Sequence, residues 1–178
     1  MSKTQEIKEE AAKKASPSVP QQDDNEKPLP KIKLSESEVE EFAKSLATGV
    51  PFSKKFSHPK ASNFVLEFRD KTKKEGDLIG RSLDRAMESK KILNWVEYTH
   101  AFNMVSMYYQ LESINGVKHI RDYPESVYKE FDVLDAMEKS PISQWTSSQV
   151  YVAMGFMFQL NQALLEASKE AFGDENFS

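Results

Sequence analysis

Side chains that could carry out catalysis or bind a metal are few in this sequence and lie far apart. The three histidines are His58, His100 and His119, and none belongs to an HExxH motif or a similar short pair of metal ligands. The chain has no cysteine, which removes thiolate nucleophiles, disulfides and cysteine-based zinc sites together. We therefore predict no metal site, and we interpret each histidine as a surface or core-edge residue.

Phosphate binding and carboxylate catalysis also lack their usual patterns. The six glycines do not cluster, so the sequence has neither a Walker loop nor a GxGxxG turn to hold phosphate on backbone amides. The carboxylate pairs Glu9-Glu10 and Glu40-Glu41 are adjacent, which on a helix places them about 100° apart rather than opposed across a cleft. A glycosidase-like pair assembled from distant positions stays open. We predict no catalytic residue, no cofactor and no enzymatic activity.

Charge and hydropathy argue against nucleic acid and membrane as partners. The net charge is −4 and the pI is near 5.5, and the basic patches Lys54-Lys55 and Lys71–Lys74 are too small for a duplex footprint. No apolar run approaches the roughly 20 residues that span a bilayer, and the N-terminal segment MSKTQEIKEE lacks the apolar stretch of a signal peptide. We predict a cytoplasmic protein.

Surplus apolar side chains favour a binding function. Aromatic and methionine residues are dense between Trp95 and Tyr109 and again between Met154 and Phe158, and we expect most of them in the core. Phe156 and Phe158 lie off the apolar stripe of their helix, and exposed Met and Phe side chains make adaptable partner surfaces. We predict partner binding or self-association, with these candidate partner-binding residues: Phe52, Phe56, Met107, Phe156 and Phe158.

Composition divides the chain into a tail, a folded domain and a short end. Residues 1–34 hold four of the eight prolines and few apolar side chains, so they cannot bury enough surface to offset their ordering entropy. We predict a disordered N-terminal tail at 1–34, or one that folds on a partner. A single helical domain at 35–173 and a short acidic C-terminal end at 174–178 follow.

The folded domain reads as mainly α-helical. Apolar periodicity and capping-box spacing predict helices from Ser35 to Gly49, Thr72 to about Ser89, Ile92 to Glu112, Val127 to Met137, and Thr146 to Gly173. The helix from Ile92 to Glu112 is apolar on more than one side, with Trp95 on its main apolar face, and Asn115-Gly116 terminates it. No heptad repeat is sustained for long enough to form a coiled coil.

One short hairpin completes the predicted fold. Apolar and polar side chains alternate along Asn63–Arg69, which predicts a strand, and residues 52–57 are its expected partner. The fold class is therefore a small helical domain of about five helices with one or two short β-strands near residues 52–69.

Short motifs follow one another in a definite order over residues 45–178. They are a helix ending in Gly49, PFSKKF at 51–56, FR at 68–69, the helix start from Thr72 to Glu75, ILNWVEY at 92–98, SINGV at 113–117, YPE at 123–125 and NF at 176–177. This order resembles the tail assembly chaperones of long-tailed bacteriophages, both siphophages and myophages.

The resemblance implies a protein that binds the tape measure protein before the tail tube polymerises. Such a chaperone keeps the long hydrophobic helices of its client soluble and helps recruit the major tail tube protein in the host cell cytoplasm, and it has no catalytic residues. Two other functions stay open: a structural head, neck or tail protein of the virion, and a small phage protein that binds a host target. Presence in purified particles would indicate the first, and a host-protein partner would indicate the second.

Overall fold

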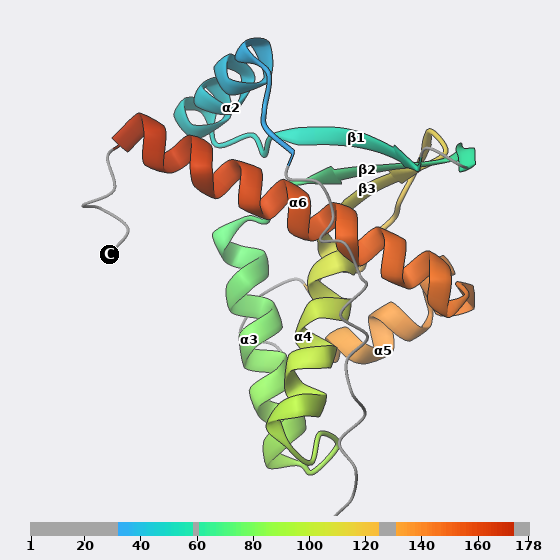
Figure 1. The fold of residues 1–178 in the computed structure, drawn as a ribbon. Coiled ribbons are helices and arrows are strands. Elements are labelled where there is room, and N and C mark those ends of the chain that lie inside the picture. Colours follow the sequence, from blue (N-terminus) through green and yellow to red (C-terminus); the bar gives the residue numbers. More distant parts are fainter. Residues whose placement is uncertain (1–31, 59–60, 125–130, 173–178) are drawn as a thin grey trace, which may run out of the picture.

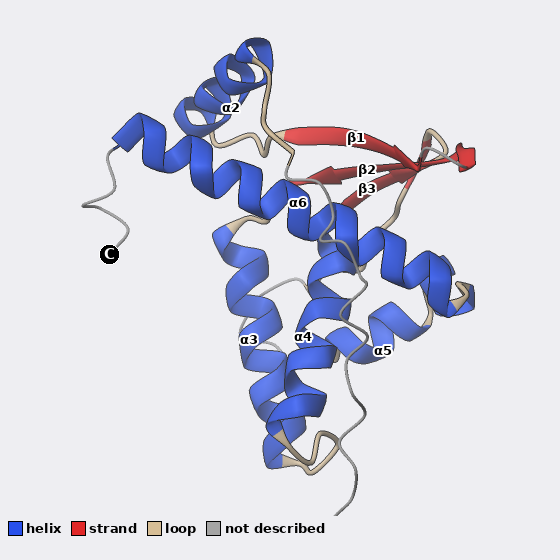
Figure 2. Cartoon of the chain, in the orientation of Figure 1, coloured by secondary structure: helices blue, strands red, loops and turns tan. Residues whose placement is uncertain are grey.

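A set of helices and a small antiparallel sheet make up the described part of the chain (Figures 1 and 2). The computed structural model describes residues 32–58, 61–124 and 131–172. The predicted C-terminal end at 174–178 and all but the last residues of the predicted tail lie outside these ranges. Ile32 and Leu34, which the sequence assigns to the tail, pack against the hydrophobic core, so the folded part begins before Ser35.

Helices dominate the structure, as the sequence predicts. Within the described residues there are five α-helices and one short 3₁₀-helix: α2 (Glu36–Thr48), α3 (Lys73–Glu88), α4 (Trp95–Gln110), α5 (Val133–Glu138), η1 (Pro141–Gln144) and α6 (Ser147–Phe172). The prediction of about five helices is confirmed. The helix predicted from Val127 begins instead at Val133, after an Asp132 cap, and residues 125–130 lie outside the described part.

Local capping hydrogen bonds explain where the long helices begin. The Glu75 backbone N–H donates to Thr72 Oγ1 at 3.2 Å, and the Thr72 N–H donates back to the Glu75 carboxylate at 2.9 Å. Ser35 and Glu38 form the same reciprocal pair at the start of α2. Thr146 and Gln149 do so at the start of α6. These bonds satisfy backbone donors that a helix start leaves unpaired, so the three predicted starts are confirmed.

The sheet has four strands rather than the one or two predicted. Its antiparallel order is β1 (Ser53–His58), β2 (Ala61–Arg69), β3 (Leu111–Ile114) and β4 (Val117–Lys118). The predicted hairpin near residues 52–69 is confirmed, with Phe56 opposite Leu66 and Lys54 opposite Phe68. The prediction of a helix continuing to Glu112 is wrong, because α4 ends at Gln110 and the chain passes directly into β3.

Asn115-Gly116 forms a hairpin turn between β3 and β4 instead of terminating a helix. Both residues have positive φ, 52° and 80°, which is the backbone of the two-residue turns that join twisted antiparallel strands. The Asn115 side chain also accepts a hydrogen bond from the Val65 backbone N–H at 2.8 Å. The turn is therefore attached to β2 as well as to its own strands.

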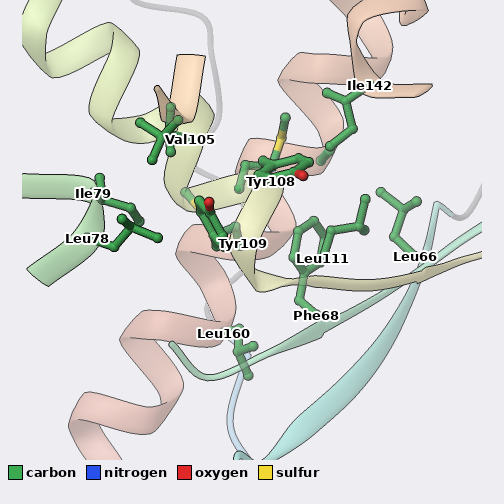
Figure 3. Close-up of a cluster of buried hydrophobic side chains, with 14 of the residues drawn as sticks. Leu66, Phe68, Leu78, Ile79, Val105, Tyr108, Tyr109, Leu111, Ile142 and Leu160 are labelled. Carbon is green, nitrogen blue, oxygen red and sulfur yellow. The ribbon is translucent and has the colours of Figure 1, made fainter. Parts of the chain in front are cut away.

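The core lies between one face of the sheet and the helices. Phe56, Leu66, Phe68 and Leu111 occupy paired positions, which places them on the same face of the sheet, and all four are buried. Figure 3 shows Leu66, Phe68 and Leu111 in one cluster with Tyr108 of α4 and Leu160 of α6. α6 contacts α4 on one side and β1 and β2 on another, so it connects the two parts of the fold (Figure 1).

Only the second half of α4 is buried. Val105, Met107, Tyr108 and Tyr109 have at most 1% of their surface exposed, whereas Trp95 in the first turn is 70% exposed. The prediction that Trp95 belongs to a buried apolar face is wrong. The α3–α4 hairpin extends beyond the rest of the described fold in Figure 1, so none of the other described elements lies at its tip to cover this side chain.

Candidate functional site

The face of α6 turned toward the core is built from small and medium apolar side chains. Ala153, Met157, Leu160, Leu164 and Ala167 are buried and recur at intervals of three or four residues. This spacing places them on one side of the helix, where they meet α4 and the sheet. The apolar stripe predicted for this helix, from Val150 to Ala171, is thus buried over its middle, while Val150 is half-buried and Ala171 is exposed.

A second row of large apolar side chains lies on the outer face of α6. Its members, here called the α6 stripe, are 45 to 61% exposed and follow one another at intervals of seven residues: Tyr151, Phe158, Leu165 and Phe172. A seven-residue step returns a side chain to nearly the same angle, with a drift of about 20°. The four side chains therefore form one line along the helix, roughly 30 Å long.

α6 itself carries no charged side chain over most of the length of the stripe. No Asp, Glu, Lys or Arg occurs between Ser147 and Leu165, and the first charged residues of α6 are Glu166 and Lys169. Exposed helix faces in soluble proteins usually carry charged side chains, and contiguous apolar surface marks an interaction site. The combination of apolar side chains and missing charge makes this face the best candidate for a functional surface.

One of the five predicted partner-binding residues, Phe158, is exposed and lies on the α6 stripe. Phe156 is half-buried because its ring stacks on Phe56, with 5.1 Å between the ring centroids. Phe158 lies two residues further along, which is about 200° around a helix, and so points away from this contact. The two residues that the sequence treats as equivalent therefore have different environments.

The other three predicted residues are part of the core, which corrects their assignment as accessible partner contacts. Phe52 is buried edge-on against Phe42 of α2, at 6.1 Å between ring centroids, and Phe56 lies on the core face of β1. Met107 is fully buried within α4. These side chains pack against neighbouring elements because each faces the sheet–helix interior, where apolar surface is removed from water.

Tyr151, Leu165 and Phe172 are the site residues that sequence reasoning missed. In the sequence, these three residues and Phe158 recur at intervals of seven. The coiled-coil pattern has two apolar positions per heptad on one face, and here the other apolar positions of α6 belong to the buried face, so the coiled-coil pattern does not reveal this row. Only the fold shows that one of the two apolar rows on α6 is left uncovered by the described elements.

A smaller apolar surface lies at the tip of the α3–α4 hairpin. Leu93, Trp95 and Val96 are 72, 70 and 80% exposed, and the Trp95 ring contacts Tyr98 edge-on at 5.1 Å. Lys90 precedes them with a left-handed φ of 59°, which turns the chain between the two helices. This hairpin tip is a second exposed apolar surface, shorter than the α6 stripe and separated from it by α3 and α4 (Figure 1).

The outer face of the sheet is polar and borders an open groove of about 870 Å³. Glu67 on β2 accepts hydrogen bonds from Ser53 of β1 at 3.1 Å and from Ser113 of β3 at 3.0 Å. Lys55 and Lys118 line the rim of the groove. The carboxylate of Glu67 thus ties three strands together on the side that faces away from the core.

Ion pairs at the end of this groove hold α3 against the sheet. Arg69 is paired with Glu75 at the start of α3 and lies 3.3 Å from the Glu112 carboxylate, and Arg121 donates to Glu112 at 2.6 Å. Burial would raise the pKa of Glu75, but hydrogen bonds from Arg69, Tyr123 and Thr72 outweigh it and lower the pKa to about 2. Each carboxylate is already matched by an arginine, so this network is suited to fixing elements in place rather than to proton transfer.

His100 and His119 lie in different environments and do not form a common site. His119 is buried against Tyr108, with 5.1 Å between the ring centroids, whereas His100 is exposed on α4. Burial lowers the pKa of His119 to about 4, and the positive charge of Arg121 adds to this effect. Among residues 32–58, 61–124 and 131–172, no group of three or more His, Asp or Glu side chains is arranged to hold a metal ion.

None of the helices in the part of the chain that the structure describes has the length and apolar character needed to span a membrane.

Comparisons with known proteins return no relative. No protein-family model, no curated protein sequence and no solved structure matches this chain.

Proposed function

We propose that this protein is a non-enzymatic binding protein that holds a helix of another protein along the outer face of α6. The observation that carries the proposal is the α6 stripe, a line of half-exposed aromatic and aliphatic side chains on a helix that has no charged residue from Ser147 to Leu165. Amphipathic helices bind such surfaces through apolar anchors spaced by about one or two helical turns. The expected partner is therefore a helix with apolar residues at intervals of three, four or seven.

The partner we propose is the tape measure protein of a long-tailed phage, with recruitment of the major tail tube protein as the consequence. The ordered motifs over residues 45–178 support this identity through their resemblance to tail assembly chaperones. The chemistry is compatible, because a tape measure protein presents long apolar helices that need cover before assembly. An uncharged aromatic stripe imposes few specific contacts, so it can hold such helices in several registers.

The proposed site of action is the host cell cytoplasm, and the proposed role ends when the tail tube forms. A chaperone of this kind must release its client, so its binding face should be apolar but not large. Four side chains that are each about half exposed meet that requirement, since a few anchors carry most of the affinity in protein interfaces.

Affinity capture of the tagged protein from phage-infected cells, followed by mass spectrometry, tests this function. The wild-type protein should recover a very long helical phage protein together with the tube subunit. The double variant Phe158→Ser/Leu165→Ser should lose both, because each substitution removes an apolar anchor from the α6 stripe. The fold should survive, since neither side chain is buried.

A matched control replaces two exposed apolar side chains that lie outside α6. The variant Val96→Ser/Ile120→Ser alters surface residues of comparable size and should capture the same two phage proteins as the wild type. Equal capture by the α6 variant would move the binding site elsewhere. Recovery of virion capsid proteins alone, or of one host protein, would replace the chaperone function with a structural or a host-directed one.

A further inference from the structure

We propose that the α6 stripe also binds a second copy of this chain, with the two α6 helices antiparallel about a two-fold axis. The residues that would form this contact are the exposed side chains of Tyr151, Phe158, Leu165 and Phe172. Apolar side chains repeated every seven residues stay aligned when two helices wrap around each other with a slight left-handed supercoil. The geometry of the dimer does not depend on any client protein. Its regulatory role, which is to cover the α6 stripe until a client binds, rests on the proposed function.

The register follows from burying all four side chains of each copy. An axis passing between Asn161 and Gln162 lies midway along the stripe. Tyr151 then meets Phe172 of the second copy, and Phe158 meets Leu165 of the second copy. Any shift by one seven-residue step leaves at least one large side chain of each copy without a counterpart, so this register removes the most apolar surface from water.

Charge favours the antiparallel orientation. Lys169 lies beside the stripe, about 40° around the helix from Leu165 and one turn before Phe172, and a parallel pair would bring the two Lys169 ammonium groups near each other. In the antiparallel pair Lys169 lies opposite Met154 of the second copy, so its alkyl chain can cover apolar surface while its ammonium reaches water. Because residues 147–165 carry no charge, the antiparallel pair meets no like-charge contact along this length.

The centre of the pair is polar. Asn161 and Gln162 are both exposed, but the Asn161 amide is bonded to buried Gln110, so Gln162 is the amide that can donate and accept hydrogen bonds across the two-fold axis. Gln110 of α4 donates to Asn161 Oδ1 at 2.7 Å, which fixes the orientation of that amide. A polar pair within an apolar seam specifies the register, since a shifted pairing would leave these amides against apolar side chains.

The size of the interface indicates a reversible dimer. An aromatic side chain buries about 150–250 Å² when it is fully covered, and three of the four stripe residues are aromatic and about half exposed. The stripe alone therefore buries less surface than a stable specific interface does, and its size matches weak, transient associations. Such a dimer covers the α6 stripe when no client is present and gives way to a client helix with a better match.

Single-cysteine variants test the geometry, because the natural chain contains no cysteine. Gln162→Cys places a thiol beside the proposed axis, where the two copies approach most closely. Lys169→Cys places it beside the stripe but about 20 Å from its counterpart in an antiparallel pair, which is far beyond the reach of a disulfide. Under mild oxidation, Gln162→Cys should form a covalent dimer and Lys169→Cys should remain monomeric on a non-reducing gel.

Sedimentation equilibrium of the unmodified full-length chain supplies the second measurement. The wild type should show a monomer–dimer equilibrium, and Phe158→Asp should sediment as a monomer while its circular dichroism stays helical. A wild type that is monomeric at every concentration would overturn the dimer, and equal cross-linking of both cysteine variants would overturn the antiparallel arrangement. Phage-protein capture that persists without a dimer would leave the proposed function standing, whereas a dimer that captures no phage protein would leave this inference standing alone.

Discussion

Trp95 and Phe68 are both large aromatic side chains, but Trp95 is largely exposed at the hairpin tip and Phe68 is fully buried in β2. We expect Trp95→Ala to change the free energy of unfolding by less than about 1 kcal/mol, as for most surface substitutions. Phe68→Ala should cost about 3–5 kcal/mol, because it removes apolar contacts and leaves a cavity. Urea unfolding of both variants measures the difference, and a comparable loss in Trp95→Ala would show that its ring is covered.

His119 makes the stability of the fold sensitive to mild acid. The unfolded chain takes up a proton near the ordinary pKa of 6.5, whereas the folded protein does so only near 4. The unfolded state binds more protons between these values, so stability should be lost as the pH falls from 6.5 toward 4, by roughly 3 kcal/mol in all. Urea unfolding at a series of pH values across this window measures the loss.

The variant His119→Gln separates this effect from other acid-sensitive groups. It should flatten the dependence of stability on pH between 6.5 and 4.5, whatever its stability at neutral pH. Glu75 contributes in a lower window, because its pKa falls from 4.5 to about 2 and its stabilisation is lost only as the pH drops below 4.5. An unchanged slope in His119→Gln would assign the acid sensitivity to another group.

Residue type alone could not identify the exposed members of the candidate site. Phe156 and Phe158 are identical in chemistry and two positions apart, yet one stacks on Phe56 and the other is exposed. Their difference is an angle around α6, which becomes meaningful only when the neighbours of each face are known. The sequence could therefore predict the surplus of apolar side chains but not which of them remained uncovered.

Element boundaries set by local hydrogen bonds were predictable. The starts of α2, α3 and α6 each depend on a side chain and a backbone group three residues apart, so the pattern is complete within four residues of sequence. The β1–β2 hairpin was also predictable, because Phe64, Leu66 and Phe68 recur at every second position of β2 and its partner is the adjacent segment.

The strand pair β3–β4 was missed because two signals conflicted. Residues up to Gln110 are helical and apolar, and nothing in the sequence breaks the helix before Leu111. Pairing with β2 extends the chain there, and this contact joins residues more than forty positions apart. The Asn115-Gly116 dipeptide was the usable signal, since it is the strongest short-range indicator of a two-residue hairpin.

The turn between β3 and β4 requires glycine at position 116. Its φ is +80° and nothing lies within 4 Å of the position that a Cβ atom would take, so Gly116→Ala should be unfavourable for backbone reasons alone, by about 1–2 kcal/mol. Gly80 within α3 also has open space but a helical backbone, and Gly80→Ala should stabilise the protein by roughly 0.5–1 kcal/mol. Thermal unfolding of the two variants should therefore shift in opposite directions, and a shift of the same sign would contradict the hairpin turn.

The packing of α6 within the whole fold decides which of its apolar faces stays exposed. α6 has two apolar rows, and the row of small and medium side chains packs against α4 and the sheet. The row of large side chains stays 45 to 61% exposed, because none of the described helices and strands packs over it. None of these elements buries Phe158 or Leu165. A client helix or a second copy of the chain, bound along α6, would cover both side chains.

A client helix and a second copy of the chain should compete for the α6 stripe. A client helix and a second copy would cover the same side chains of α6, so they cannot bind one molecule together. The Gln162→Cys dimer, once oxidised, should fail to capture the long helical phage protein, and reduction of the same sample should restore capture. Oxidised wild-type protein has no cysteine and should capture the client throughout, which controls for damage by the oxidant. Capture by the cross-linked dimer would mean that the client binds elsewhere, and the exposed hairpin tip at Leu93, Trp95 and Val96 would be the surface to change next.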